Sequence, residues 1–190
     1  MIETPRLQLL PLDAKFLEFS LAGDRAAAEK WLGATIDEPW FDIRWLMELR
    51  LEDLRENAAL LPWLLRGIVL RDERRMIGHI GFHDSPGAEH LEGFAPDGAE
   101  FGYEVYPNYR RHGYAREAVC GLLAWAERVH QVPHFVASVS PTNIPSRNLI
   151  LSLGFELVGS QIDEIDGPED IFVRTGAPRF VRRERKDKEF

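Results

Sequence analysis

The sequence of 190 residues has few of the features that mark secreted and membrane proteins. Its single cysteine, Cys120, excludes an intrachain disulfide and favours a reducing compartment. The longest apolar run, residues 58–65, contains a proline and is far shorter than the roughly 20 residues of a membrane helix. Residues 1–15 lack a basic segment followed by a long apolar run, so we expect no signal peptide and a cytoplasmic protein.

Positive charge is also scarce, because 23 lysines and arginines face 31 acidic residues and give a net charge of -8. This balance disfavours a nucleic-acid or anionic-membrane partner, both of which attract basic surfaces, and it fits a cationic or amine partner. The sequence has neither a G-x-x-x-x-G-K-[ST] nor a G-x-G-x-x-G motif, which excludes two common phosphate-binding loops.

The apolar residues, 45% of the chain, recur with periods that predict one α/β domain. The expected order is strand, helices, three strands, helix, strand, helix and two strands, which predicts a mixed, mostly antiparallel sheet of about seven strands with about four helices. We expect this domain to span residues 1–176 and the charged residues 177–190 to form a tail. The predicted strands are 6–10, 63–70, 76–83, 99–107, 134–141, 155–163 and 169–175, and the predicted helices are 13–32 (one helix or a pair), 41–54, 114–130 and 143–153.

The segment YPNYRRHGYAREAV, residues 106–119, places a basic turn between a strand and a helix. The first four amides of a helix have no partner within it and lie at the positive end of its dipole, where anions bind. Gly113 allows a ligand to approach the backbone, and Arg110 and Arg111 add cationic donors. An ordinary solvated basic turn is the alternative, but the strand, glycine and helix together favour a cradle for phosphate.

The spacing R-x-x-G-x-A, at Arg110, Gly113 and Ala115, resembles the pyrophosphate-binding signature [QR]-x-x-G-x-[GA] of the GNAT superfamily of acetyl-CoA-dependent N-acetyltransferases. Four segments match in the same order: TPRLQLLPL, MIGHIGFHD, FGYEVYPNYRRHGYAREA and PTNIPSRNLILSLGF. They most resemble the branch with the ribosomal-protein alanine N-acetyltransferases. The resemblance implies the GNAT fold, in which the fourth and fifth strands splay apart to admit acetyl-CoA.

The resemblance also implies roles for individual residues. The backbone near Val105 and Tyr106 would bind the pantetheine arm and the thioester carbonyl. Asn143 would help to hold the cofactor near its sulfur, and Ser146 would protonate the departing thiolate, although either could simply cap a helix. The pyrophosphate would lie in the turn formed by Arg110, Arg111, His112, Gly113, Tyr114 and Ala115.

Transfer to an amine also needs a proton acceptor, and the carboxylates of Glu104 and Glu100 are the candidates in the predicted strand. Their even separation predicts that both point to one face, with Gly102, unless a bulge interrupts the strand. We rank Glu104 first, although either residue could instead be an exposed or ion-paired strand residue.

No metal is expected. His79 and His83 are four residues apart on a predicted strand, roughly 13 Å, which is too far to share a zinc ion, and His90 lies further on. Cys120 has no adjacent basic partner, which favours a buried thiol and direct transfer over a covalent acetyl-enzyme.

The acceptor is expected to be a primary amine, either a protein N-terminus or a small amine such as a polyamine or an aminoglycoside. Glu89, Glu92 and Asp97, in the glycine- and proline-rich segment 84–98, suggest a cationic acceptor. A non-catalytic acyl-CoA-binding module is the alternative from another class. The protein could be a monomer or a homodimer.

Overall fold

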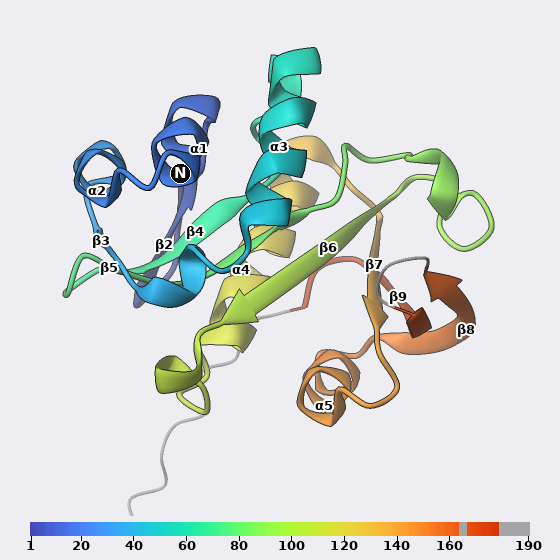
Figure 1. The fold of residues 1–190 in the computed structure, drawn as a ribbon. Helices are drawn as coiled ribbons and strands as arrows, with labels where there is room; N and C mark the ends of the chain where they lie inside the picture. The colour runs from blue at the N-terminus through green and yellow to red at the C-terminus, as the bar shows by residue number, and fades with distance from the viewer. Residues whose placement is uncertain (164–166, 179–190) are drawn as a thin grey trace, which may run out of the picture.

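A twisted sheet runs through the part of the chain that the computed structural model describes, residues 1–163 and 167–178 (Figure 1). Its strands follow the order β1-β2-β4-β5-β6-β7-β9-β8, with β3 paired to β5. The β3–β5 and β6–β7 pairs are parallel, and the other pairs are antiparallel. The strands are β1 (Ile2–Glu3), β2 (Leu7–Pro11), β3 (Thr35–Ile36), β4 (Arg66–Leu70), β5 (Arg75–Phe82), β6 (Gly98–Val105), β7 (His134–Val139), β8 (Glu156–Asp163) and β9 (Gly167–Thr175).

Helices lie on both faces of this sheet (Figure 1). Helices α1 to α3 cover one face, α4 packs on the other, and α5 contacts β7. The helices are α1 (Ala14–Leu21), α2 (Arg25–Leu32), α3 (Arg44–Glu56), α4 (Tyr114–His130) and α5 (Ile144–Ser152), and the short 3₁₀ turns are Glu38–Trp40, Ala58–Leu60, Glu89–Leu91 and Pro107–Tyr109.

Helix α4 has the bounds that its apolar period predicts. Ala118, Leu122 and Ala126 recur at helical spacing and are fully buried against the sheet. Glu117 lies in the first turn of the helix and basic residues lie in the last, which suits the helix dipole. Gln131, in the left-handed conformation at φ 59°, ends the helix.

The predicted helical region 13–32 is a pair of helices. The Asp13 carboxylate caps α1 by accepting a hydrogen bond from the Phe16 amide at 2.9 Å. Asp24 caps α2 through the Ala27 amide at 3.0 Å, directly after Gly23 at φ 73°. Both starts therefore follow from short acidic side chains that satisfy free helix amides.

Two apolar clusters hold the layers together. The cluster under α4 contains Cys120, which is 3% exposed, so the expectation of a buried thiol is confirmed. Burial raises the pKa of that thiol, which makes it a poor nucleophile. The cluster under α1 to α3 contains Trp40, whose indole nitrogen donates to the Ser20 hydroxyl at 3.0 Å.

The structure refines the predicted counts. Among the described residues it has nine strands, because β1 and β3, of two residues each, were not predicted, and five α-helices, because region 13–32 forms two. The glycine- and proline-rich segment 84–98 is not wholly exposed, because it buries Leu91 and Ala95 against Val136 and Ile171. Of the predicted tail, residues 179–190 lie outside the described residues. No helix in the described part of the chain is long and apolar enough to span a membrane.

Candidate active site

The parallel strands β6 and β7 form a fork. They pair only from Gly98↔His134 to Glu100↔Val136, and beyond that point β7 continues its pairing with β9 alone. Strands β6 and β7 correspond to the fourth and fifth predicted strands, so the expected separation of these two strands is present. A cavity of about 760 Å³ lies in this region. Its lining residues are Tyr103, Glu104, Val105, Tyr109, Arg110, Arg111, Gly113, Tyr114, Ala115, Arg116, Asn143, Pro145, Ser146 and Leu149.

The backbone of β6 presents alternate residues to the fork. The Tyr106 amide donates to the Ile77 carbonyl at 2.9 Å, and the His83 amide donates to the Glu100 carbonyl at 2.9 Å. Since antiparallel pairs alternate between bonded and non-bonded positions, the backbone groups of Tyr103 and Val105 point away from β5. These two residues therefore offer main-chain donors and acceptors to the slot that β7 leaves open.

The structure distinguishes Val105 from Tyr106. The Val105 carbonyl faces the fork and accepts a hydrogen bond from Arg110 Nε at 2.7 Å. Tyr106 is 1% exposed, packs under α1 to α3 and does not line the cavity, and its amide is committed to β5. Burial, aided by the negative charges of Glu104 and Asp37, raises the pKa of the Tyr106 phenol.

The turn before α4 carries two left-handed residues, Arg111 at φ 68° and Gly113 at φ 80°. For Arg111, which has a side chain, this conformation costs roughly 1–2 kcal/mol. The first helical bond runs from the Glu117 amide to the Gly113 carbonyl at 3.1 Å, so the amides of the three preceding residues have no acceptor within the helix. Three unpaired amides at the positive end of a helix, beside a glycine, form the kind of backbone arrangement that can bind an anion.

Two predicted turn residues make contacts within the protein, and only one of them, Arg110, lines the cavity. Arg110 folds back along β6, where it also contacts Glu104 Oε1 at 3.3 Å. His112 does not line the cavity, and its ring Nδ1 lies 2.8 Å from the Arg110 carbonyl. Arg116, which was not among the predicted residues, also lines the cavity. Its position three residues after Gly113, in the first turn of the helix, could have identified it.

Glu104 and Glu100 lie on the same face of β6, as predicted. The β5–β6 register runs without a shift from Gly78↔Val105 to Phe82↔Phe101, so no bulge interrupts the alternation. Glu104 lines the cavity, and its side chain is 40% exposed. Glu100 does not line the cavity, and its side chain is 7% exposed.

Where β6 and β7 separate, three side chains contact the carboxylate of Glu100. It accepts from the Ser138 hydroxyl at 2.5 Å, and His90 Nε2 lies 2.9 Å and His83 Nδ1 3.5 Å from its carboxylate. Burial raises the pKa of Glu100, but the contacts with His83, Ser138 and His90 outweigh it and lower the pKa to about 2. A carboxylate with this pKa is a weak base at neutral pH.

Gly102, between the two carboxylates, has a steric role. A Cβ atom at this position would lie 2.9 Å from His83 Nε2, so the missing side chain lets the imidazole lie over the strand. Thus His83 and His90 converge on the Glu100 carboxylate, which the sequence did not predict.

His79 is buried beside Trp40, and burial lowers its pKa to about 4. Among the described residues no group of three or more histidine, cysteine or acidic side chains could hold a metal ion.

On the other side of the cavity, Asn143 and Ser146 begin helix α5. Asn143 Oδ1 accepts from the Ser146 amide at 3.3 Å and caps the helix. The Ser146 hydroxyl lies 3.0 Å from the hydroxyl of Tyr103, a residue that the sequence analysis did not select. Burial raises the pKa of the Tyr103 phenol. The signal for Tyr103 was the strand alternation, which directs it opposite to Glu104.

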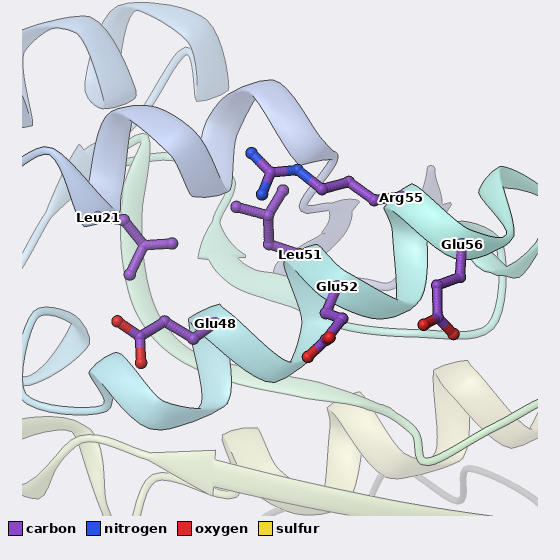
Figure 2. Close-up of a pocket in the computed structure, with 6 residues that line it drawn as sticks. All are labelled: Leu21, Glu48, Leu51, Glu52, Arg55 and Glu56. Carbon is purple, nitrogen blue, oxygen red and sulfur yellow. The ribbon is translucent and has the colours of Figure 1, made fainter.

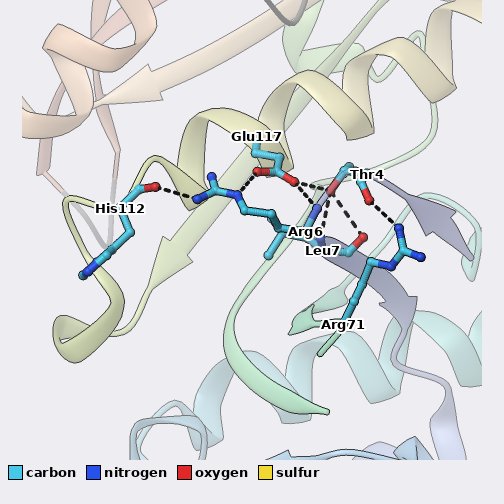
Figure 3. A network of polar contacts seen from close by, with 6 residues as sticks. All are labelled: Thr4, Arg6, Leu7, Arg71, His112 and Glu117. Atoms are coloured by element: carbon cyan, nitrogen blue, oxygen red, sulfur yellow. Dashed lines mark hydrogen bonds and ion pairs between the residues drawn. The ribbon is translucent and has the colours of Figure 1, made fainter. Parts of the chain in front are cut away.

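Behind the turn lies a polar network that joins the N-terminal segment to α4 (Figure 3). The Glu117 side chain is 1% exposed and accepts hydrogen bonds at 2.7 Å from the Thr4 hydroxyl, the Arg6 amide and Arg6 Nε. The Arg6 NH1 group donates to the His112 carbonyl at 3.0 Å. This clamp was not predicted, because its partners are more than 100 residues apart.

A second hollow, of about 510 Å³, lies between α1 and α3 and shares no lining residue with the fork cavity. Glu48, Glu52 and Glu56 project from one side of α3, with Leu51 and Arg55 above them (Figure 2). Two of the charged residues that line the hollow form ion pairs: Glu48 with Arg44 at 2.9 Å and Arg55 with Glu18 at 3.2 Å. The hollow is therefore an acidic surface groove and not part of the fork site.

Comparison with known proteins shows similarity in sequence and in fold. The N-acetyltransferase YnaD of Bacillus subtilis (strain 168), itself uncharacterized, is 34% identical over 104 residues, which are 55% of this chain and 54% of YnaD. The chain thus matches about half of the length of this relative.

Two solved structures share the fold. One is the ribosomal-protein-S5-alanine acetyltransferase from Vibrio fischeri, with 15% identity and a TM-score of 0.60 over 92% of this chain and 95% of that one. The other is the microcin C7 self-immunity acetyltransferase MccE, in complex with acetyl-CoA and AMP, with 18% identity and a TM-score of 0.60 over 90% and 93%.

Residues 6–156, which include β2, the fork strand β6, the turn and α5, match the family model described as "Acetyltransferase (GNAT) domain". The resemblance noted from the four sequence segments is confirmed, and a ribosomal-protein acetyltransferase is among the chains of similar fold. The chain therefore belongs to the family of GNAT acetyltransferase domains.

Proposed function

We propose that the protein transfers an acetyl group from acetyl-CoA directly to a primary amine. The observation that carries this proposal is the continuity of one segment: the edge of β6 that β7 leaves unpaired runs into the cationic turn and the amino end of α4. The edge of β6 suits an extended arm that contains amides, and the turn with the amino end of α4 suits a pyrophosphate. The acetyl-CoA bound to MccE, which has the same fold, supports this reading.

The cavity supplies a place for each part of the donor. The backbone of Val105 and Tyr103 would bind the pantetheine amides and the thioester carbonyl, and an amide of this edge would stabilise the oxyanion. The turn residues Arg111 to Ala115 would bind the pyrophosphate, with Arg116 and Arg110 as further cations. Asn143, on the opposite wall, would lie near the sulfur.

The chemical step needs one base and one acid. The amine nitrogen attacks the thioester carbon, a C–N bond forms and the C–S bond breaks. Glu104, at the cavity wall, takes the proton that the amine loses, directly or through water. The CoA thiolate takes a proton from the hydroxyl pair of Ser146 and Tyr103. Glu100 is a weaker candidate for the base because its carboxylate is buried and already has three donors.

Two measurements on the purified protein test this function. Millimolar acetyl-CoA should raise the melting temperature, because a ligand that binds only the folded state stabilises it. Thiol release should then be measured with N-terminal peptides, polyamines and aminoglycosides as acceptors. No thermal shift would overturn the proposal. A shift without thiol release from any of these amines would favour the non-catalytic acyl-CoA-binding module.

A further inference from the structure

Arg6, at the start of β2, contacts the proposed pyrophosphate turn from behind (Figure 3). Its NH1 group donates to the His112 carbonyl at 3.0 Å, and its guanidinium carbon lies 4.5 Å from the centre of the Tyr114 ring. A Cβ atom on Gly113 would lie 3.6 Å from the Arg6 NH2 group. Arg6 does not line the fork cavity, so it touches the turn on the side away from the ligand space.

A buried carboxylate fixes the direction of this arginine. Glu117 accepts from both the Nε and the main-chain amide of Arg6 at 2.7 Å. Thr4 donates its hydroxyl to the same carboxylate at 2.7 Å. Because Glu117 is on the first turn of α4, the guanidinium bridges the helix to the loop that precedes it. An arginine can make both contacts because its planar guanidinium holds several N–H donors in a fixed geometry.

The contact with the His112 carbonyl has a consequence for the next amide. The peptide between His112 and Gly113 is planar and trans, so its carbonyl and its N–H point in opposite directions. Arg6 holds the carbonyl on the β2 side. The Gly113 N–H is therefore directed away from Arg6, towards the cavity that Gly113 lines.

We propose that Arg6 is a positioning residue that, held by Glu117, orients the Gly113 amide of the turn for pyrophosphate. The inference rests on the proposed function, since it assumes that the turn binds acetyl-CoA. It adds a residue of the first strand that acts through the backbone of the turn and does not touch the ligand itself.

The test compares two ligands and three variants. S-acetylpantetheine carries the thioester arm without the pyrophosphate, so calorimetric titration with it and with acetyl-CoA separates the two halves of the site. Arg6→Ala should weaken acetyl-CoA binding about tenfold, the value of one charge-assisted hydrogen bond, and leave acetylpantetheine binding unchanged. Arg6→Lys keeps the positive charge but lacks the planar guanidinium with its several donors. Its affinity for acetyl-CoA should fall nearly as much as that of Arg6→Ala.

Arg71 provides a matched control. Its NH1 group donates to the Thr4 carbonyl at 3.1 Å, so Arg71→Ala removes the same charge and one hydrogen bond from the same segment without touching the turn (Figure 3). This variant should keep its acetyl-CoA affinity. Hydrogen exchange of residues 111–116 in the free protein should accelerate in Arg6→Ala and not in Arg71→Ala.

The outcomes separate the two proposals. If the wild-type protein binds no acetyl-CoA, the proposed function fails and the inference fails with it. If it binds and the Arg6 variants bind equally well, or if both ligands lose affinity together, only the positioning role is overturned. Full affinity in Arg6→Lys would also overturn it, because charge alone would then account for the effect.

Discussion

The two ends of β6 carry the same acidic side chain in opposite environments. At its carboxyl end, Glu104 lies at the wall of an open cavity beside free main-chain groups and a cationic turn. At its amino end, where β6 joins β7, Glu100 is buried and its oxygens are occupied by three side chains. The difference shows that burial and the number of contacting side chains, and not residue type or strand face, distinguish the two carboxylates.

The largest expected effect comes from placing a negative charge in the turn that follows the carboxyl end of β6. Gly113→Asp puts a carboxylate against the turn and a side chain at φ 80°, so acetyl-CoA should no longer raise the melting temperature. Gly23→Asp is the control. It adds the same charge at a similar φ of 73°, where no atom lies within 4 Å of the new Cβ. Equal cofactor binding by the two variants would contradict the cradle.

Substitution of Glu100, near the amino end of β6, should affect the stability of the fold instead. The fall in the pKa of Glu100 from 4.5 to about 2 corresponds to about 3 kcal/mol of folding free energy, so Glu100→Gln should unfold more easily in urea at pH 7 by about that amount. Because the folded pKa is the lower one, this stabilisation is complete above pH 4.5 and is lost as the pH falls towards 2. The difference between wild type and variant should shrink by more than half between pH 5 and pH 3. A constant difference would exclude the linkage.

Glu104→Gln makes the complementary test. With any amine that supports thiol release, the rate should fall about 100-fold, the lower range for loss of a general base, while the calorimetric affinity for acetyl-CoA and the urea midpoint stay near wild type. Glu100→Gln, corrected for its folded fraction, should retain its rate. The reverse pattern would assign the base to Glu100.

How far the sequence predicts this molecule depends on the range of the interactions. Helix α4 and the turn at Gly113 follow from local signals: an apolar period, a glycine and a helix start. The two-residue strands β1 and β3 have no such period and exist because a neighbouring strand pairs with them.

The same distinction holds within the site. Strand parity places Glu100 and Glu104 on one face, but their opposite fates depend on Ser138, His83 and His90, which tertiary folding brings to Glu100. The contact between Arg6 and Glu117 spans 111 residues of sequence, and no single-sequence pattern connects them.

The smallest expected effect concerns the hydroxyl pair opposite Glu104. Tyr103 and Ser146 lie 3.0 Å apart, and either could pass a proton to the CoA thiolate. An alkyl alcohol is a weaker acid than a phenol, even one whose pKa is raised by burial as in Tyr103, so the phenol is the better final donor. Tyr103→Phe should therefore slow thiol release about tenfold, somewhat below the usual contribution of a general acid, because Ser146 or water substitutes for it. Ser146→Ala should slow thiol release less than Tyr103→Phe. A larger loss in Ser146→Ala, with unchanged acetyl-CoA affinity in both variants, would make the serine the donor and the tyrosine its hydrogen-bond partner.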